Sequence, residues 1–172
     1  MGKIENLIKQ YRLLSDWYLS VLENISDEDG KKTIGENTNS IEWLAGHLIT
    51  GRYRNLMRIG VNIEPYKYMD KFINQSAPPP NAIAFSKDIK YPTLTECRAQ
   101  WEIYTDLFLK GLEKVDEKIL NTEMNFRVPT GGNTIEDALN FIVMHESFHI
   151  GQISIMRKTL GLPSMQLGLR AK

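Results

Sequence analysis

Apolar residues recur at steps of three and four residues along four long stretches of the chain, and this spacing gathers side chains on one face of an α-helix. The first stretch shows the clearest stripe, made of Ile4, Leu7, Ile8, Tyr11, Leu14, Tyr18, Val21, Leu22 and Ile25. The other stretches run from Asn39 or Ser40 to Gly60, from Thr93 to Val115, and from Asn133 or Thr134 to Leu160. The pattern predicts an all-α fold, a four-helix bundle.

Capping residues support the predicted starts of the second, third and fourth helices. The run Thr93-Leu94-Thr95-Glu96 is a capping box, in which each end residue's side chain accepts a hydrogen bond from the other's backbone N–H. Similar signals precede the second and fourth helices, because Glu42 lies three residues after Asn39 and Glu136 lies three residues after Asn133. We therefore expect helix boundaries close to these positions.

The connections between the predicted helices differ in length. Residues 26–39 and 119–133 show no helical periodicity and are expected to form loops. The segment 61–92 is longer and rich in proline, and only a short amphipathic piece at 66–72 is a candidate helix within it. Parallel neighbouring helices need a crossover along the whole bundle, whereas antiparallel neighbours need a short turn. The length of this segment therefore favours a long crossover between parallel second and third helices.

Composition narrows the class of protein. With 172 residues, 42% of them hydrophobic, we expect one domain over residues 1–172. The 21 basic residues balance the 21 acidic ones without forming a basic stripe, which argues against a nucleic-acid partner. No apolar run approaches the ~20 residues of a membrane span, and the N-terminus begins an amphipathic helix instead of a signal peptide. The single cysteine, Cys97, lies on an apolar stripe, which predicts an inert buried thiol in a cytoplasmic protein.

The chain has three histidines, and two of them, His145 and His149, stand four residues apart in a predicted helix. This spacing places the two imidazoles about 40° apart around the helix and about 6 Å apart along it, so that one cation can contact both. The third, His47, lies in another predicted helix. We predict a three-histidine metal site, with zinc or nickel as first choices and cobalt, copper, iron or manganese as alternatives. Three protein ligands leave open coordination positions, which is typical of a catalytic site.

Other interpretations of these histidines stay open. Each could be a hydrogen-bonded core residue, and the run from His145 to His149 also matches the zincin pattern, in which Glu146 would be the general base. No histidine follows His149 and no sheet is predicted, so the zincin interpretation is disfavoured. We expect Glu146 to flank the site as a solvated or interface carboxylate. The inward face of the fourth helix is predicted to hold Ala138, Ile142, His145, His149, Gln152 and Met156.

Two segments resemble the DinB-like superfamily. The run from His145 to Ile153, followed by Arg157 and Leu160-Gly161, is similar to its fourth-helix signature, and the run from Ser40 to Leu48 is similar to its second helix. The resemblance implies an up-down-down-up bundle, a metal held by residues aligned with His47, His145 and His149, and frequently a homodimer. Characterised relatives include bacillithiol transferases and mycothiol-dependent isomerases. The isomerase branch resembles a His/Glu/His set, so three histidines favour transfer or hydrolysis here.

Three functions follow from these observations. The first is a metal-dependent transferase that adds a low-molecular-weight thiol to a small electrophile, with Gln152 or Arg54 contacting the substrate. For Gln152 the alternative is a supporting hydrogen bond, and for Arg54 it is a solvated surface position. The second function is hydrolysis by metal-bound hydroxide. The third is a non-catalytic bundle that stores a metal, or that binds a partner with residues 65–92 as the contact surface. In that case the tryptophans would be exposed instead of lying in the core or a dimer interface; these are Trp17, Trp43 and Trp101.

Overall fold

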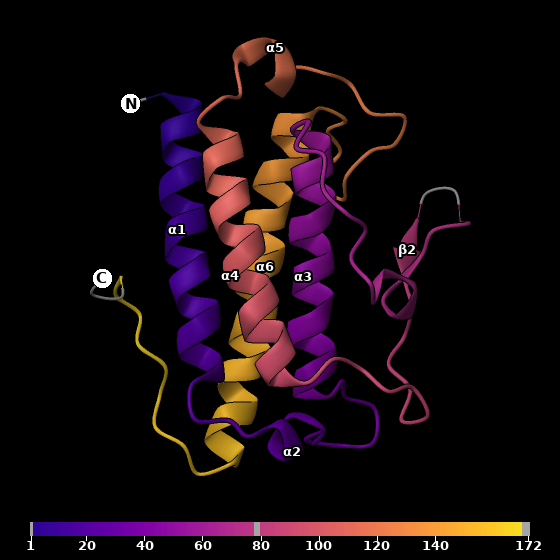
Figure 1. The fold of residues 1–172 in the computed structure, drawn as a ribbon, viewed down its shortest axis with the longest axis vertical. Coiled ribbons are helices and arrows are strands. Elements are labelled where there is room, and N and C mark those ends of the chain that lie inside the picture. The colour runs from indigo at the N-terminus through magenta and orange to yellow at the C-terminus, as the bar shows by residue number, and fades with distance from the viewer. Residues whose placement is uncertain (1, 78–79, 170–172) are drawn as a thin grey trace.

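The computed structural model describes residues 2–77 and 80–169, and four long helices form the body of this part (Figure 1). They are α1 (Lys3–Leu22), α3 (Ile41–Arg58), α4 (Leu94–Leu112) and α6 (Ile135–Thr159). Helices α1 and α3 each pack against both α4 and α6. Each of the four predicted helices is present, and the prediction of an all-α bundle is confirmed.

The long helices follow an up-down-down-up topology (Figure 1). Helices α3 and α4 run in the same direction, and α1 and α6 run opposite to them. The chain between α3 and α4 therefore has to return along the length of the bundle, as the length of this connection predicted. It does so on the outside, next to α3.

This crossover contains little regular structure. One 3₁₀ turn, η1 (Met69–Lys71), lies where a short helix was predicted over 66–72. It is followed by a small antiparallel hairpin of β1 (Ile73–Asn74) and β2 (Asn81–Ala82), in which Ile73 pairs with Ala82. The hairpin stands beside α3 and supplies part of the wall of a cavity.

Two connections that were predicted as loops each contain one helical turn. These turns are α2 (Asp27–Gly30) and α5 (Glu117–Leu120). The side chains of Ser26 and Asp116 cap them, each accepting a hydrogen bond from a backbone N–H in the first turn. A helix of four residues is too short to show an apolar repeat, so the capping residues were the only local signal.

The helix starts also decide between the predicted caps. Ser40 caps α3 by accepting from Trp43 N, so the alternative that paired Asn39 with Glu42 is wrong. Thr134 caps α6, and its capping-box partner is Asp137 instead of Glu136. The predicted capping box at the start of α4 is present.

Aromatic side chains fill the middle of the bundle. Trp101 is fully buried and stacks on Tyr18, with ring centroids 3.9 Å apart. Trp43 is buried as well, while Trp17 is partly buried against the core. Cys97 is completely buried, and this burial raises the pKa of its thiol, so the predicted burial of the cysteine is confirmed.

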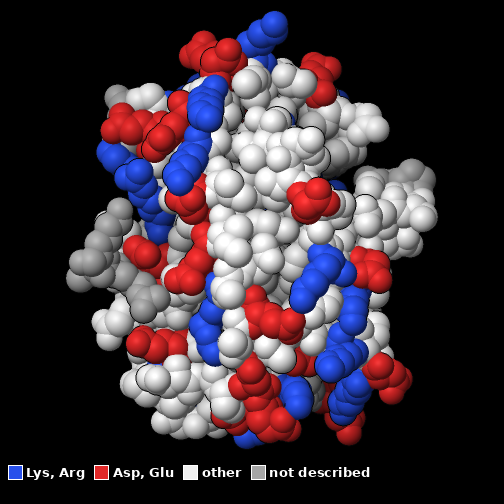
Figure 2. All heavy atoms as spheres, viewed as in Figure 1, with Lys and Arg blue, Asp and Glu red and all other residues white. Residues whose placement is uncertain are grey.

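The surface carries both signs of charge. On the face drawn in Figure 2, basic and acidic side chains are interspersed and no stripe of one sign forms. No helix in the described part of the chain is both long and apolar enough to cross a lipid bilayer.

Candidate metal centre

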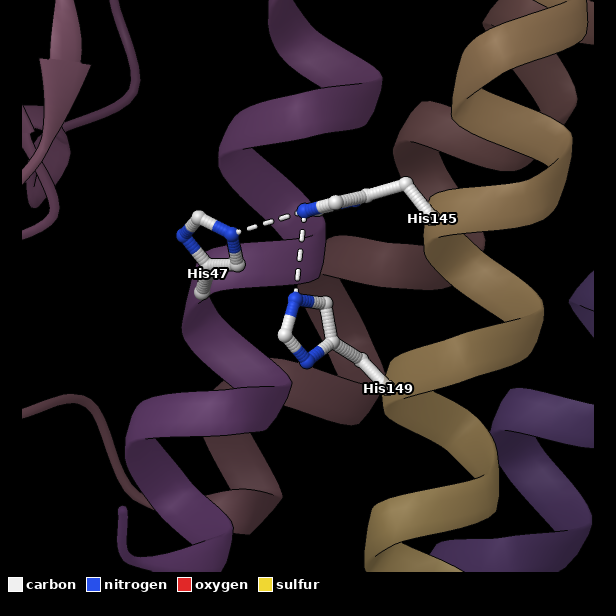
Figure 3. Close-up of side chains that lie close together, drawn as sticks. All are labelled: His47, His145 and His149. Carbon is white, nitrogen blue, oxygen red and sulfur yellow. Dashed lines mark hydrogen bonds between the residues drawn. The ribbon is translucent and has the colours of Figure 1, made fainter. Parts of the chain in front are cut away.

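Helices α3 and α6 bring the three histidines together (Figure 3). His47 comes from the first half of α3, and His145 and His149 come from successive turns of α6. The Nε2 atom of His145 lies 3.1 Å from Nε2 of His47 and 3.1 Å from Nε2 of His149. Residues almost one hundred positions apart therefore direct the same ring nitrogen to one point.

The spacing of these nitrogens suits one metal ion. Zinc binds imidazole nitrogen at about 2.0–2.1 Å, so two nitrogens on one tetrahedral ion lie about 3.4 Å apart. The two measured separations are close to that value, and the ligand atoms of all three residues lie within 4.8 Å of one another. The cluster can hold a metal ion.

The protonation of the rings favours the same conclusion. Burial is the main cause that lowers the pKa of His47 to about 3 and that of His145 to about 4, and burial also lowers the pKa of His149. Neutral imidazoles are the form that binds metals. Without a cation, His145 Nε2 can either donate one hydrogen bond or accept one, so the second 3.1 Å contact between ring nitrogens would have no hydrogen bond.

Neighbouring side chains orient two of the rings. Gln152 Oε1 lies 2.6 Å from His149 Nδ1. Because an amide oxygen only accepts, Nδ1 of His149 carries the proton and its Nε2 lone pair points into the cluster. The indole of Trp43 stacks on His47 with centroids 4.8 Å apart and an angle of 8°. The other ring nitrogens of His47 and His145 are buried without a hydrogen-bond partner among the described residues.

A cavity of about 290 Å³ opens beside His47 and His145. It lies between α3 and α6 and is covered by the β1–β2 hairpin and by the loop between α5 and α6. Its walls are mostly apolar and include Phe126, Phe141 and Ile142. At Gly51, one turn after His47, an added Cβ atom would meet no atom outside the adjoining helix backbone within 4 Å, so the space beside this turn is open.

Arg54 and Arg58 line the same cavity from α3. Arg54 is half-buried, so it does not hold the solvated surface position that was the expected alternative. Burial lowers the pKa of Arg54, and its positive charge is one of the causes that lower the pKa of His47. Gln152 does not line this cavity; its described contact is the supporting hydrogen bond to His149, which was the alternative to a substrate contact.

The expectation that Glu146 is a solvated carboxylate is wrong. Its side chain is 1% exposed, and it forms an ion pair with Arg52, which is 0% exposed. Arg52 Nε donates to Glu146 Oε1 at 2.5 Å, and Nη2 donates to Oε2 at 2.8 Å. Both carboxylate oxygens are thus engaged away from the histidines, so Glu146 cannot be the general base of a zincin mechanism. Burial raises the pKa of Glu146, and the charge of Arg52 opposes that rise.

The buried face of α6 is centred one position away from the predicted one. The buried side chains include Leu139, Ile142, Glu146, Ile150 and Ile153, while the two histidines lie half-buried at the edge that faces α3. On α3, Arg52 lies four residues after Leu48 and four before Leu56, within the apolar stripe. A charged residue on an apolar stripe was the signal from which this pair could have been found.

Comparisons with known proteins agree with the fold. The family model of the DinB superfamily matches residues 10–153. No curated protein matches the chain. A DinB-like protein of Bacillus cereus ATCC 10987 shares 16% identity, with 94% of this chain and 95% of that chain covered and a TM-score of 0.69.

A second solved structure is YfiT from Bacillus subtilis, described as a probable metal-dependent hydrolase with an unusual four-helix bundle topology. It shares 15% identity, with 95% of this chain and 91% of that chain covered, and the TM-score is 0.67. At these identities the likeness concerns the fold. The family match covers most of the chain, from within α1 to the last two turns of α6, and includes all three histidines. The chain therefore belongs to the DinB superfamily.

Proposed function

We propose that the protein is a metal-dependent enzyme in which His47, His145 and His149 hold one divalent cation, with zinc or nickel as the first choices. The convergence of the three Nε2 atoms beside an apolar cavity carries this proposal. A divalent cation held there would lower the pKa of a coordinated water or thiol toward neutrality. The family match to the DinB superfamily supports a metal-dependent site.

Other side chains of the site would orient the histidine rings and exclude water. Gln152 fixes the ring of His149, and the indole of Trp43 fixes the plane of His47. Phe126, Phe141 and Ile142 form walls that exclude water from a bound substrate. Desolvation of this kind strengthens the electrostatic interactions of a reacting group.

The side chains of the cavity favour transfer of a small thiol as the reaction. None of its described lining residues is Asp, Glu, Lys or Tyr, and the hydroxyl of Thr50 donates to the backbone oxygen of His47 at 2.6 Å. An amine leaving group needs a proton donor, whereas a halide leaves as an anion without one. In the proposed reaction the thiol proton passes to solvent, a sulfur–carbon bond forms, and the carbon–halogen bond breaks with its electron pair on the halide.

Hydrolysis of a small ester or amide is the second candidate. It is favoured by the likeness of the fold to YfiT, a probable metal-dependent hydrolase. A bundle that binds a metal or a partner without catalysis is the third. The described residues of the connection 65–92 contribute Ile73, Pro80 and Ala82 to the cavity wall, which favours a substrate-binding role for that segment.

One set of assays separates these candidates. Protein purified without an affinity tag is stripped of metal, reloaded with zinc or nickel, and mixed with cysteine and 1-chloro-2,4-dinitrobenzene. We expect metal-dependent formation of the thioether, which is lost in His145→Asn and retained in Asn140→Ala, an exposed residue of the same helix. Turnover of nitrophenyl esters without thioether formation would replace transfer by hydrolysis. Stoichiometric metal with neither reaction would favour the non-catalytic bundle.

We also propose that two copies of the chain pair through α6. Met144, Phe148 and Ile155 are 61%, 63% and 59% exposed and recur at helical spacing on this helix. Exposed apolar stripes of this kind are typical of interfaces between proteins. Light scattering should give the mass of a dimer, and Phe148→Lys should give a monomer. Ile103→Lys, at an exposed apolar residue of α4, is the matched control and should leave the mass unchanged.

A further inference from the structure

The cavity beside the histidines has an excess of positive charge. Its described lining includes Arg54, Arg58 and Arg127, and no Asp or Glu. The whole chain has equal numbers of basic and acidic residues, so this imbalance belongs to the cavity and not to the composition. Arg127 is exposed and donates to the backbone oxygen of Gly131 at 2.7 Å, which leaves Arg54 and Arg58 as the deeper pair.

Arg54 and Arg58 share one face of α3 with His47. The positions 47, 51, 54 and 58 follow steps of four, three and four residues, and all four line the cavity. Side chains on a helix lean toward its N-terminus, so that Arg54 leans toward His47 across Gly51, which has no side chain. The guanidinium and the imidazole cluster therefore face the same space from one helix.

The guanidinium of Arg54 is half-buried but has no hydrogen-bond acceptor or counter-charge among the described residues. Arg54 is the one arginine of residues 2–77 and 80–169 for which no hydrogen bond or ion pair is found, although it is half-buried. The fully buried Arg52 pairs with Glu146, and the buried Arg157 donates to backbone oxygens that include Pro163 O at 2.6 Å. A desolvated cation without a counter-charge is unfavourable, and an anion in the cavity would relieve it.

Arg58 adds a second positive charge without adding a carboxylate. Its guanidinium donates to Asn55 Oδ1 and lies 5.8 Å from the ring centroid of Phe126. Burial, followed by the charge of Arg54, lowers the pKa of Arg58 to about 10. Two like charges that face one space repel each other, and an anion between them offsets the repulsion. Guanidinium groups bind carboxylate and phosphate through paired hydrogen bonds.

We propose that Arg54 and Arg58 form an anion-binding subsite that takes the carboxylate or phosphate group of a small molecule with an apolar body. The apolar body contacts Phe126, Phe141 and Ile142, and the reacting end lies toward His47 and His145. The volume of about 290 Å³ is at the small end for ligand sites. This proposal rests on the proposed function for the position of the reacting end, while the preference for an anion rests on the arginines alone.

Calorimetric titration with simple probes tests the subsite. Benzoate, phenyl phosphate and neutral benzamide have similar apolar bodies and differ in charge. We expect benzoate or phenyl phosphate to bind at least about tenfold more tightly than benzamide, and the tighter of the two identifies the preferred anion. The preference should persist in metal-free protein and in His145→Asn, because it does not require the metal. Equal binding of all three probes would overturn the proposal, as would a preference that disappears with the metal.

Substitutions of Arg54 test whether this side chain causes the preference for anionic probes. Arg54→Met keeps the length of the side chain and removes its charge, and it should reduce the anion preference at least about tenfold. Arg54→Lys should retain part of it, which keeps the test informative if the methionine variant unfolds. Arg12→Met is the matched control, since Arg12 is exposed and pairs with Glu113 at 3.8 Å. An unchanged preference in both Arg54 variants would contradict the assignment.

The outcomes separate this proposal from the proposed function. An arginine-dependent anion preference in a protein without metal-dependent turnover would refute the enzyme assignment and leave the subsite intact. Metal-dependent turnover with no discrimination between benzoate and benzamide would refute the subsite alone.

Discussion

Two polar clusters lie between α3 and α6, and they are neighbours on both helices. Arg52 and Glu146 form one, and the three histidines form the other, with Glu146 next to His145 in sequence. Hydrogen bonds from Arg52 to Ser15 at 3.1 Å and to Thr105 at 3.3 Å extend the first cluster to α1 and α4. The guanidinium also lies 4.2 Å from the ring centroid of Trp101. The first cluster thus has partners on all four long helices.

The histidine cluster differs in exposure and in partners. It borders a cavity, its pKa values are lowered, and two of its ring nitrogens lack partners among the described residues. A buried polar group that is completely paired helps to specify one packing of the helices, whereas an unpaired group is costly and is retained where a ligand completes it. The comparison separates a fully paired cluster, which stabilises the fold, from a cluster with unpaired ring nitrogens, which suits the proposed metal site.

The largest effect is expected from breaking the paired cluster. Glu146→Ala leaves Arg52 charged and buried without its carboxylate, and removing one partner of a buried pair costs about 3–5 kcal/mol. The free energy of unfolding, measured with urea at pH 7, should fall by that amount. Replacing both residues by apolar ones, Arg52→Met with Glu146→Leu, should restore most of the loss. A loss below about 1 kcal/mol in the single variant would contradict this role.

An exposed ion pair provides the control for the same measurement of the free energy of unfolding. Lys110 and Asp106 are 2.7 Å apart on α4 but are 67% and 61% exposed. Asp106→Ala should therefore change the free energy of unfolding by less than about 0.5 kcal/mol, because solvent screens exposed pairs.

The second effect concerns the histidines, where a substitution should weaken metal binding strongly and change the stability of the fold only slightly. His145→Asn should lower zinc affinity by at least about 100-fold, because it removes the ligand that both other rings approach. In metal-free protein it should change the free energy of unfolding by no more than about 1 kcal/mol. Competition with a coloured chelator gives the affinity. Unchanged zinc affinity, or a large loss of stability without metal, would place this residue with the structural cluster.

A smaller effect is expected when a ligand loses its support. Gln152→Ala removes the acceptor that holds His149 Nδ1, and losses of this kind reduce metal affinity by about 10–100-fold. Gln152→Glu keeps an acceptor and should retain most of the affinity. If the alanine variant binds zinc as tightly as the parent protein, the hydrogen bond does not orient the ring.

The last effect is a pH dependence of the stability of the metal-free protein. The pKa of His47 is lowered to about 3 in the folded state, against an ordinary value near 6.5, so below pH 6.5 the unfolded chain binds the proton and the folded chain does not. Its contribution to stability is therefore complete above pH 6.5 and is lost as the pH falls. The slope is about 1.4 kcal/mol per pH unit for one such group.

Subtracting the unfolding curve of His47→Asn from that of the parent protein isolates this contribution from other titrating groups. The difference should decline between pH 6.5 and pH 4.5. A flat difference would mean that the folded protein protonates His47 as readily as the unfolded chain does.

Local patterns predicted most of the scaffold. The long helices follow from apolar periodicity, and the capping box at Thr93 marks the start of α4. The parallel course of α3 and α4 follows from the length of the connection between them. The short helices α2 and α5 were missed, because a single turn has no periodicity.

The site features that local patterns did not predict depend on contacts between residues far apart in the sequence. The spacing of His145 and His149 predicted that they share a face. His47 was predicted as the third ligand although no local rule places it beside them, and the family resemblance supported that prediction. The pairing of Arg52 with Glu146 joins positions 94 residues apart, and no local rule specifies it. For Arg54, the sequence left a substrate contact and a solvated surface position open, because the segments that cover it, the hairpin and the loop after α5, are placed by the whole fold.

The long crossover also has a consequence for how such a protein diversifies. Bundle geometry requires a return segment outside α3. Met69 and Phe72 in this segment are buried in the core, whereas Pro80 and Ala82 in its hairpin are exposed. Ile73 and Ala82 in this segment form one wall of the chamber, opposite groups supplied by the rigid scaffold. Substitutions at the exposed Pro80 or Ala82 should therefore reshape the chamber while the core contacts of the helices and of Phe72 are kept.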